Sequence, residues 1–233
     1  MVEGICQEGK GRKNQVGLDP VTNLEYNNSW KGLNSVGHVG HVGHEEEYLM
    51  EALRSDKHYT WADYVTWDED IRCELIDGIV YMMTAPSMTH QGISMNLSTQ
   101  LNVFLKGGPC KVFAAPFDVR LNVEDGDDTV VQPDILVVCD RGKLSEKGCQ
   151  GAPDLVVEIL SPSSGAYDKI LKFNKYLEAG VREYWIVYPD RRIVDVFVWD
   201  NGKYVASSYS EEDAMPSHVL EGCVITLADV FAE

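Results

Sequence analysis

Two short apolar segments constrain the fold most strongly: VVQPDILVVCD at residues 130–140 and GAPDLVVEILSPSS at residues 151–164. Short runs rich in valine, isoleucine and leucine are typical of strands buried within a sheet. Both segments nevertheless contain acids, with Asp134 at the head of the first and Asp154 and Glu158 in the second. A buried carboxylate without a partner is costly, so these acids need a cation or hydrogen-bond donors.

Helical and strand patterns follow one another along the chain from about Glu46 onward. The turns Asp77-Gly78 and Asn201-Gly202 each separate two strand-like runs and predict β-hairpins. The patterns predict helices at 46–54, 60–67, 87–108, 165–179 and 226–233, and strands at 71–83, 110–123, 129–140, 153–160, 183–189, 193–200 and 203–210. This order predicts an α/β (α+β) fold with a mixed β-sheet core flanked by helices.

The first 45 residues differ from the rest of the chain. They are rich in glycine and asparagine and show neither helical nor strand periodicity, which predicts a poorly ordered extension before a domain at 46–233. Within the extension, VGHVGHVGH places His38, His41 and His44 three residues apart. Such a repeat can bind a transition metal, but glycine-rich chain does not hold ligands in place, so a polar tail is the favoured interpretation.

Composition narrows the class of protein. The six cysteines are scattered without a CxxC pair, which predicts reduced thiols and a cytoplasmic location. No apolar run has the length of a membrane span, and the N-terminus lacks the apolar stretch of a signal peptide. The net charge of −17 argues against a protein that coats nucleic acid without specificity.

The acids of the two strands can form one site. Neighbouring strands are about 5 Å apart, so Asp134 and Glu158 can share a cation if they point from the same face. Asp154 has the same parity as Glu158, but four residues of strand span roughly 13 Å. We therefore expect Asp154 to mark the start of the strand and not to share the site.

The helix predicted after these strands supplies a lysine. Asp168, Lys172 and Tyr176 are spaced by four residues and form a stripe on one helix face. Two acids on a sheet face followed by a lysine suit a Mg²⁺ site for phosphoester hydrolysis, in which the lysine offsets developing charge. The alternative is an ordinary surface ion pair between Asp168 and Lys172.

Several segments, taken in order, resemble a known family. CELIDGIVYMMTAPSMTH, VQPDILVV, PDLVVEILSPSS, DKILKFNKY and AGVREYWIVYPD are similar to the Uma-type putative restriction endonuclease family of the PD-(D/E)XK nuclease superfamily. The resemblance covers about residues 58–233. It implies a restriction-endonuclease-like fold and a catalytic centre that binds Mg²⁺, with Mn²⁺ as a substitute.

The resemblance also implies roles for individual residues. Asp134, Glu158 and the backbone of Ile159 correspond to the metal ligands. Leu160 stands where the superfamily has its motif lysine, and Lys172 on the following helix corresponds to the lysine of the Uma-type family.

Glu74 and His90 complete the set that the resemblance implies. Glu74 corresponds to an additional or water-mediated metal ligand. His90 corresponds to a residue that contacts phosphate or transfers a proton near neutral pH. A histidine near the start of a helix can equally serve as a capping or hydrogen-bonding residue, and both interpretations stay open.

Together with these residues, the resemblance implies a metal-dependent endonuclease that hydrolyses phosphodiester bonds of DNA. The strongly acidic chain leaves two alternatives, a catalytically inactive nuclease-fold binding module and a metal-dependent phosphodiesterase acting on another substrate such as RNA. Cutting both strands of a duplex usually needs two sites, so a homodimer is also expected.

Overall fold

The computed structural model of this protein describes residues 57–68, 70–123, 125–161 and 166–232. The predicted extension at 1–45, with His38, His41 and His44, lies outside these residues, as does the helix predicted near Glu46. In the part of the chain that is described, no helix is both long and apolar enough to cross a membrane.

In the described residues, the helices lie within the ranges that the sequence predicts. They are α2 (Trp61–Tyr64), α3 (Met88–Leu105), α4 (Ala166–Ala179) and α5 (Leu227–Val230), with single 3-10 turns at η1 (Arg141–Lys143) and η2 (Pro189–Arg191). Before α3, the Ser87 hydroxyl accepts a hydrogen bond from the backbone N–H of His90. Before α2, the backbone N–H of Thr60 donates to the Asp63 carboxylate. Both contacts satisfy helix N–H groups that have no partner within the helix.

The strands form two six-stranded mixed sheets. The first has the order β2-β1-β5-β4-β8-β7 and the second the order β12-β11-β10-β9-β6-β3, and a separate pair β13-β14 lies near the C-terminus. The bounds are β1 (Cys73–Ile76), β2 (Ile79–Met82), β3 (Lys111–Ala114), β4 (Val119–Arg120), β5 (Val130–Val131), β6 (Ile135–Val138), β7 (Leu144–Ser145), β8 (Gly148–Gln150), β9 (Leu155–Ile159), β10 (Glu183–Tyr188), β11 (Ile193–Asp200), β12 (Lys203–Ser210), β13 (Ala214–Pro216) and β14 (Val224–Thr226).

The fold class predicted from the sequence is confirmed, but two long predicted strands are each divided in two. The run at 110–123 becomes β3 and β4 around Pro116, and the run at 129–140 becomes β5 and β6 around Pro133. Proline lacks the backbone N–H that a central strand needs, so the ladder stops there. At both prolines the chain moves from one sheet to the other.

Both predicted hairpins are present. β1 pairs with β2 in antiparallel fashion around Asp77 and Gly78, whose φ angles are 51° and 72°. β11 pairs with β12 around Asn201 and Gly202, whose φ angles are 49° and 86°. Positive φ at both turn residues is the property of the type I′ turn that these dipeptides favour.

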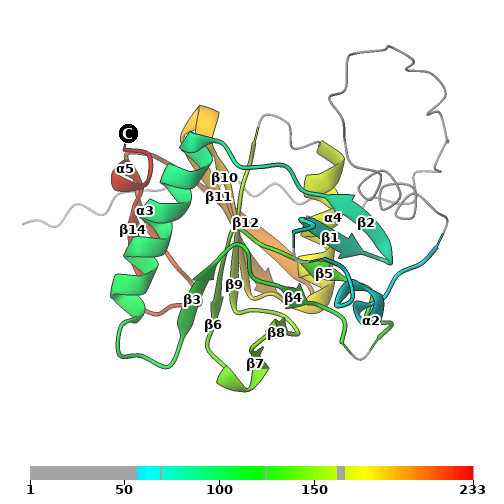
Figure 1. Ribbon diagram of the computed structural model, residues 1–233. Coiled ribbons are helices and arrows are strands. Elements are labelled where there is room, and N and C mark those ends of the chain that lie inside the picture. Colours follow the sequence, from blue (N-terminus) through cyan, green and yellow to red (C-terminus); the bar gives the residue numbers. More distant parts are fainter. Residues whose placement is uncertain (1–56, 69, 124, 162–165, 233) are drawn as a thin grey trace, which may run out of the picture.

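The second sheet is covered on both faces, as Figure 1 shows. Residues of α3, α5 and the β13-β14 pair form one apolar cluster against β6, β9 and β10. Residues of α4 and of the first sheet form another cluster against the opposite face. The buried, aliphatic character of β6 and β9 follows from this position between two layers.

The cysteines depart from the sequence-based expectation. Cys110 and Cys139 form a disulfide bond, so reduced thiols at these two positions were the wrong prediction. β3 and β6 pair with Lys111 opposite Val138, and one step further along this register Cys110 faces Cys139. Spacing along the chain could not show this pairing. Cys73, Cys149 and Cys223 are free and buried, which agrees with the predicted reduced thiols at these positions.

Candidate metal and phosphodiester site

Asp134 and Glu158 lie side by side on adjacent strands. β6 and β9 are antiparallel with Ile135 opposite Val157, so one further step along the register places Asp134 opposite Glu158. Glu158 lies near the end of β9, and Asp134 directly precedes β6 after the proline that lets the chain cross between sheets. The two carboxylates therefore lie on neighbouring strands of the second sheet, at the start of β6 and the end of β9.

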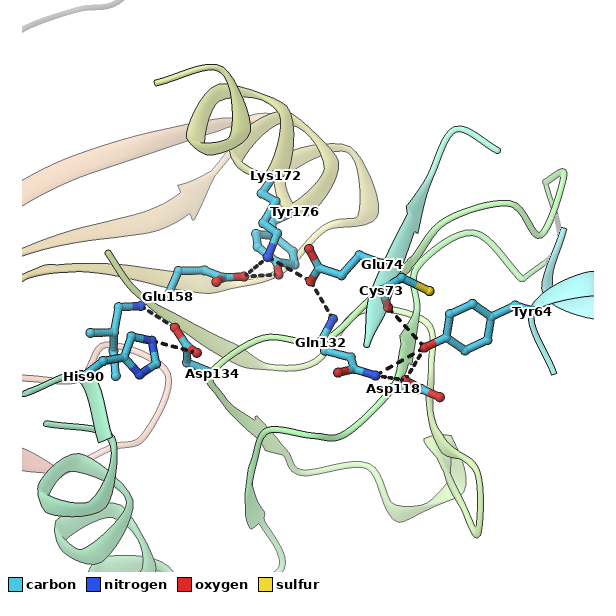
Figure 2. A network of polar contacts seen from close by, with 11 residues as sticks. Tyr64, Cys73, Glu74, His90, Asp118, Gln132, Asp134, Glu158, Lys172 and Tyr176 are labelled. Atoms are coloured by element: carbon cyan, nitrogen blue, oxygen red, sulfur yellow. Dashed lines mark hydrogen bonds and ion pairs between the residues drawn. The ribbon is translucent and has the colours of Figure 1, made fainter. Parts of the chain in front are cut away.

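Lys172 reaches these acids from α4. Its Nζ lies 3.2 Å from the Glu158 Oε1 atom and 2.8 Å from the Glu74 Oε1 atom. One helical turn later, the hydroxyl of Tyr176 donates a hydrogen bond of 2.6 Å to the same Glu158 oxygen. The four-residue spacing of Lys172 and Tyr176 thus directs both side chains to one carboxylate (Figure 2). The side chain of Asp168 lies outside the described residues.

Glu74 comes to the site from the other sheet. It lies on β1, and its residue is only 4% exposed. Besides the ion pair with Lys172, its Oε1 atom accepts a hydrogen bond of 2.8 Å from the backbone N–H of Gln132. Lys172 therefore bridges two buried carboxylates, one from each sheet.

His90 contacts Asp134. From the first turn of α3, its Nε2 atom lies 3.1 Å from Asp134 Oδ1, while the backbone N–H of Ile159 donates to Oδ2 at 2.7 Å. The hydrogen bond with Asp134 raises the pKa of His90 above its ordinary value, although burial opposes this shift. The Nδ1 atom of His90 is buried beside the backbone of Ile159 and makes no well-formed hydrogen bond to the described residues.

The site holds more acid than base. Glu74 and Glu158 contact the ammonium group of Lys172, and Asp134 contacts His90. Burial raises the pKa of Glu158, and the charges of Asp134 and Glu74 act in the same direction, whereas Lys172 opposes them. Burial also raises the pKa of Tyr176, so its phenol remains protonated and donates to the carboxylate.

Comparison with known proteins identifies the family. A family model described as "Uma2: Putative restriction endonuclease" matches residues 61–228. The chain belongs to the Uma2 family. Two uncharacterized proteins of Synechocystis sp. are similar to it: slr1290 is 31% identical over 157 residues, covering 66% of this chain and 81% of that protein, and sll1609 is 26% identical over 131 residues, covering 54% and 72%.

A solved structure has the same fold. It is the crystal structure of a putative nuclease belonging to DUF820 from Anabaena variabilis, with a TM-score of 0.62 and 20% sequence identity. The match covers 74% of this chain and 97% of the other. Fold similarity at this level of identity supports the architecture of the Uma2 protein and does not assign a reaction to it.

The side chains of the Uma2 protein suit a hard divalent cation. Mg²⁺ prefers oxygen ligands and is commonly held by one or two carboxylates together with water, which Asp134 and Glu158 can provide. No three His, Cys, Asp or Glu residues in the described part of the chain are grouped so that they would hold a metal ion as they stand. The ammonium group of Lys172 lies between Glu74 and Glu158, where it balances their negative charge without a metal ion.

Two further residues of the PD…E region have structural surroundings. Asp154 accepts a hydrogen bond of 2.6 Å from the backbone N–H of Cys139 and pairs with Arg182, which agrees with its predicted place at the start of the strand. Leu160, at the position of the superfamily lysine, packs against an apolar cluster. Its backbone N–H donates to Val187. The ammonium group that contacts Glu158 comes instead from Lys172 on α4.

In the sequence, Tyr176 belongs to the helix stripe with no assigned role, and no pattern points to Gln132. The spacing of four residues from Lys172 is the signal that could have assigned Tyr176 to the Glu158 carboxylate. For Gln132 the sequence offered only its place before the proline-aspartate pair. Its partners come from segments distant in the chain, at Tyr64 and Asp118.

Proposed function

We propose that this Uma2 family member is a metal-dependent endonuclease that hydrolyses phosphodiester bonds of DNA. The observation that carries the proposal is the register of β6 and β9, which sets Asp134 opposite Glu158 at the ends of these two strands. Lys172 and His90 reach these two carboxylates from the layers on opposite faces of the sheet. A packed core alone would not need these four ionisable groups to converge from both faces of the sheet.

In this proposal Asp134, Glu158 and the backbone carbonyl of Ile159 would hold Mg²⁺, or Mn²⁺ in its place. The bound ion would polarise the phosphate and lower the pKa of a coordinated water. The hydrogen bonds from His90 and from the backbone N–H of Ile159 keep both oxygens of Asp134 in fixed directions. Hydrogen bonds to a carboxylate that holds a metal ion orient its oxygens toward the ion.

Lys172 takes the part of the missing motif lysine in this proposal. Its ammonium group lies at the Glu158 carboxylate, so it can offset the charge that develops on a phosphate held there. Glu74 contacts the same ammonium group from the other side, with 2.8 Å between its Oε1 atom and Nζ. Leu160 could not provide this charge.

The family suggests the substrate class, whereas the acidic charge of the chain opposes it. The Uma2 description points to DNA, and two copies of the chain would place one site on each strand of a duplex. With a net charge of −17, the chain repels a polyanion at long range, so we expect DNA binding to depend on the metal ion. RNA or another phosphodiester would fit the same carboxylates.

Metal binding is the first test. We expect calorimetry with Mg²⁺ and Mn²⁺ to show saturable binding to the wild type that is lost in Asp134→Asn and in Glu158→Gln. Both substitutions keep the side-chain shape and remove the charge. Absence of saturable binding to the folded wild type would contradict the proposal and favour the inactive binding module.

Cleavage is the second test. Supercoiled plasmid DNA and a structured RNA, each incubated with the wild type and metal, distinguish the substrate classes. We expect Lys172→Met to lower the rate of DNA cleavage by about 100-fold or more, as for loss of a charge-stabilising group. The control is Lys175→Met, since Lys175 pairs with Asp77 and Glu178 at the surface of the same helix. RNA cleavage without DNA cleavage would replace the substrate and keep the metal chemistry.

A further inference from the structure

Gln132 lies where the chain crosses from one sheet to the other. It follows β5 in the first sheet and precedes Asp134 and β6 in the second, with Pro133 between. Its backbone N–H donates to the Oε1 atom of Glu74 at 2.8 Å. The crossover therefore joins the two acids of the site that belong to different sheets.

The side chain of Gln132 forms a second set of contacts, shown in Figure 2. Its amide nitrogen donates to Asp118 Oδ1 at 2.8 Å and to the Tyr64 hydroxyl at 3.2 Å. Tyr64 in turn donates to the same Asp118 oxygen at 3.0 Å. An ionised carboxylate only accepts hydrogen bonds, which fixes the orientation of the amide group. Burial raises the pKa of Tyr64, and the charge of Asp118 adds to this shift, so the phenol remains a donor.

The segment at 115–118 holds the crossover at both ends. The backbone N–H of Ala115 donates to the carbonyl of Asp134 at 3.0 Å, and the Asp118 carboxylate receives Gln132. Asp118 is itself braced, because its carbonyl accepts a hydrogen bond of 2.8 Å from the backbone N–H of Cys149. The three residues from Gln132 to Asp134 are thus fixed relative to β4 and β8.

This arrangement costs free energy that a packed apolar side chain would not. The Oε1 atom of Gln132 is buried and has no hydrogen-bond partner among the described residues. A buried acceptor without a partner lowers the stability of the fold. Asp118 is partly buried. Among the described residues, it forms no ion pair with a lysine, arginine or histidine. A polar network with these costs fixes one geometry at the crossover instead of adding stability.

We propose that Gln132 is a positioning residue of the nuclease site, which sets Asp134 relative to Glu74 by binding Asp118 and Tyr64. The inference rests on the proposed function. Gln132 touches neither metal nor phosphate in this proposal. It acts through the backbone that carries Asp134, and its loss should weaken metal binding and slow cleavage while the substrate contacts stay the same.

The test compares Gln132→Met with Gln100→Met. Methionine keeps the length of the side chain and removes its amide, while the backbone N–H to Glu74 remains. Gln100 is a matched control, because its amide also makes two hydrogen bonds, to the backbone N–H and carbonyl of Thr226, on the far side of α3. Both glutamines are half-buried.

We expect Gln132→Met to weaken Mn²⁺ binding in calorimetry and to lower kcat for plasmid cleavage, each by about 10- to 100-fold, with KM for DNA unchanged. Gln100→Met should lower the melting temperature and leave both quantities as in the wild type. Adding Asp118→Asn to Gln132→Met should cause little further loss, because the two residues act as one unit. Tyr64→Phe, which removes a single hydroxyl, is the milder variant if Gln132→Met does not fold.

The two proposals fail in different ways. A wild type that neither binds metal nor cleaves DNA overturns the proposed function, and this inference with it. A wild type that does both, with folded Gln132→Met or Tyr64→Phe protein that keeps wild-type metal affinity and kcat, overturns the positioning role alone. An equal rise in KM and fall in melting temperature for Gln132→Met and Gln100→Met would also reduce Gln132 to a structural residue.

Discussion

At the scale of single residues, the charge balance of the site depends on Lys172. Its side chain is 9% exposed and contacts Glu158 and Glu74, which are 12% and 5% exposed at their side chains. Removing one partner of a buried ion pair leaves an uncompensated charge, which typically costs about 3–5 kcal/mol. We expect Lys172→Met to lower the free energy of unfolding by this amount in metal-free buffer.

Urea denaturation measures this loss. The control is again Lys175→Met, because the partners of Lys175 are 53% and 65% exposed and such pairs are worth about 1 kcal/mol or less. Combining Lys172→Met with Glu74→Gln should cost less than the sum of the two single changes. Equal, small losses for both lysine variants would show that the buried contacts of Lys172 do not carry this energy.

His90 gives a prediction about pH. Its pKa is raised in the folded protein by the hydrogen bond with Asp134, so the protonated form is favoured in the fold. A raised pKa contributes stability that is fully present below the unfolded value of about 6.5 and is lost as pH rises through the folded value.

We therefore expect the difference in unfolding free energy between wild type and His90→Gln to be largest below the unfolded pKa of about 6.5. The difference should shrink as the pH rises above that value, through the raised pKa of His90 in the fold. Chemical denaturation at a series of pH values in metal-free buffer measures it. His58→Gln is the comparison, because the contact between His58 and Asp128 is made by a side chain that is 60% exposed. A difference for His90→Gln that grows with pH would contradict the assignment.

At the scale of elements, the hairpin β1-β2 holds Glu74 in place through its turn. Gly78 has a φ of 72°, and a Cβ atom there would lie 2.3 Å from Nδ1 of His58. Gly202 in the hairpin β11-β12 has a φ of 86° and no atom within 4 Å of such a Cβ. Comparing alanine substitutions at Gly78 and Gly202 therefore separates the cost of backbone strain from the cost of a steric clash.

We expect Gly202→Ala to cost about 1–2 kcal/mol from the left-handed backbone alone. Gly78→Ala should cost more, since His58 must leave Asp128 to make room. Thermal or urea unfolding of the two variants gives the comparison. A loss at Gly78 no larger than that at Gly202 would mean that the His58 ring moves aside without cost.

At the scale of the whole molecule, Glu183 connects the central sheet to the C-terminal segment. It is fully buried on β10, and its Oε1 atom accepts a hydrogen bond from the indole of Trp185 at 2.8 Å. Its Oε2 atom accepts from the Ser217 hydroxyl and from the backbone N–H groups of His218 and Val219, at 2.8–2.9 Å. A single carboxylate thus anchors the connection between β13 and β14.

We expect Glu183→Gln to lower the free energy of unfolding by about 2 kcal/mol or more, because its amide NH₂ group faces donors that need an acceptor. Limited proteolysis should then cut the variant within residues 214–226 faster than it cuts the wild type there. Glu211→Gln is the control, as it loses only the exposed pair with Arg192. Proteolysis of Glu183→Gln at wild-type rates would argue against the anchoring role.

The sequence by itself determined the local elements and the candidate residues of the site. Apolar period, capping serine and the two glycine-containing turns depend on neighbours within a few residues, so α3, α4 and both hairpins could be predicted. Asp134 and Glu158 were also within reach, because acids within two buried strands need an explanation wherever the strands go.

Only the tertiary structure decided which distant residues meet. The sheet register pairs Cys110 with Cys139 and divides the strands between two sheets, and it brings Glu74 on β1 to Lys172 on α4. Gln132, Asp118 and Tyr64 are separated by up to 68 positions and share one network. Pairing over such distances depends on how whole layers pack, and no pattern within a short window of sequence contains that information.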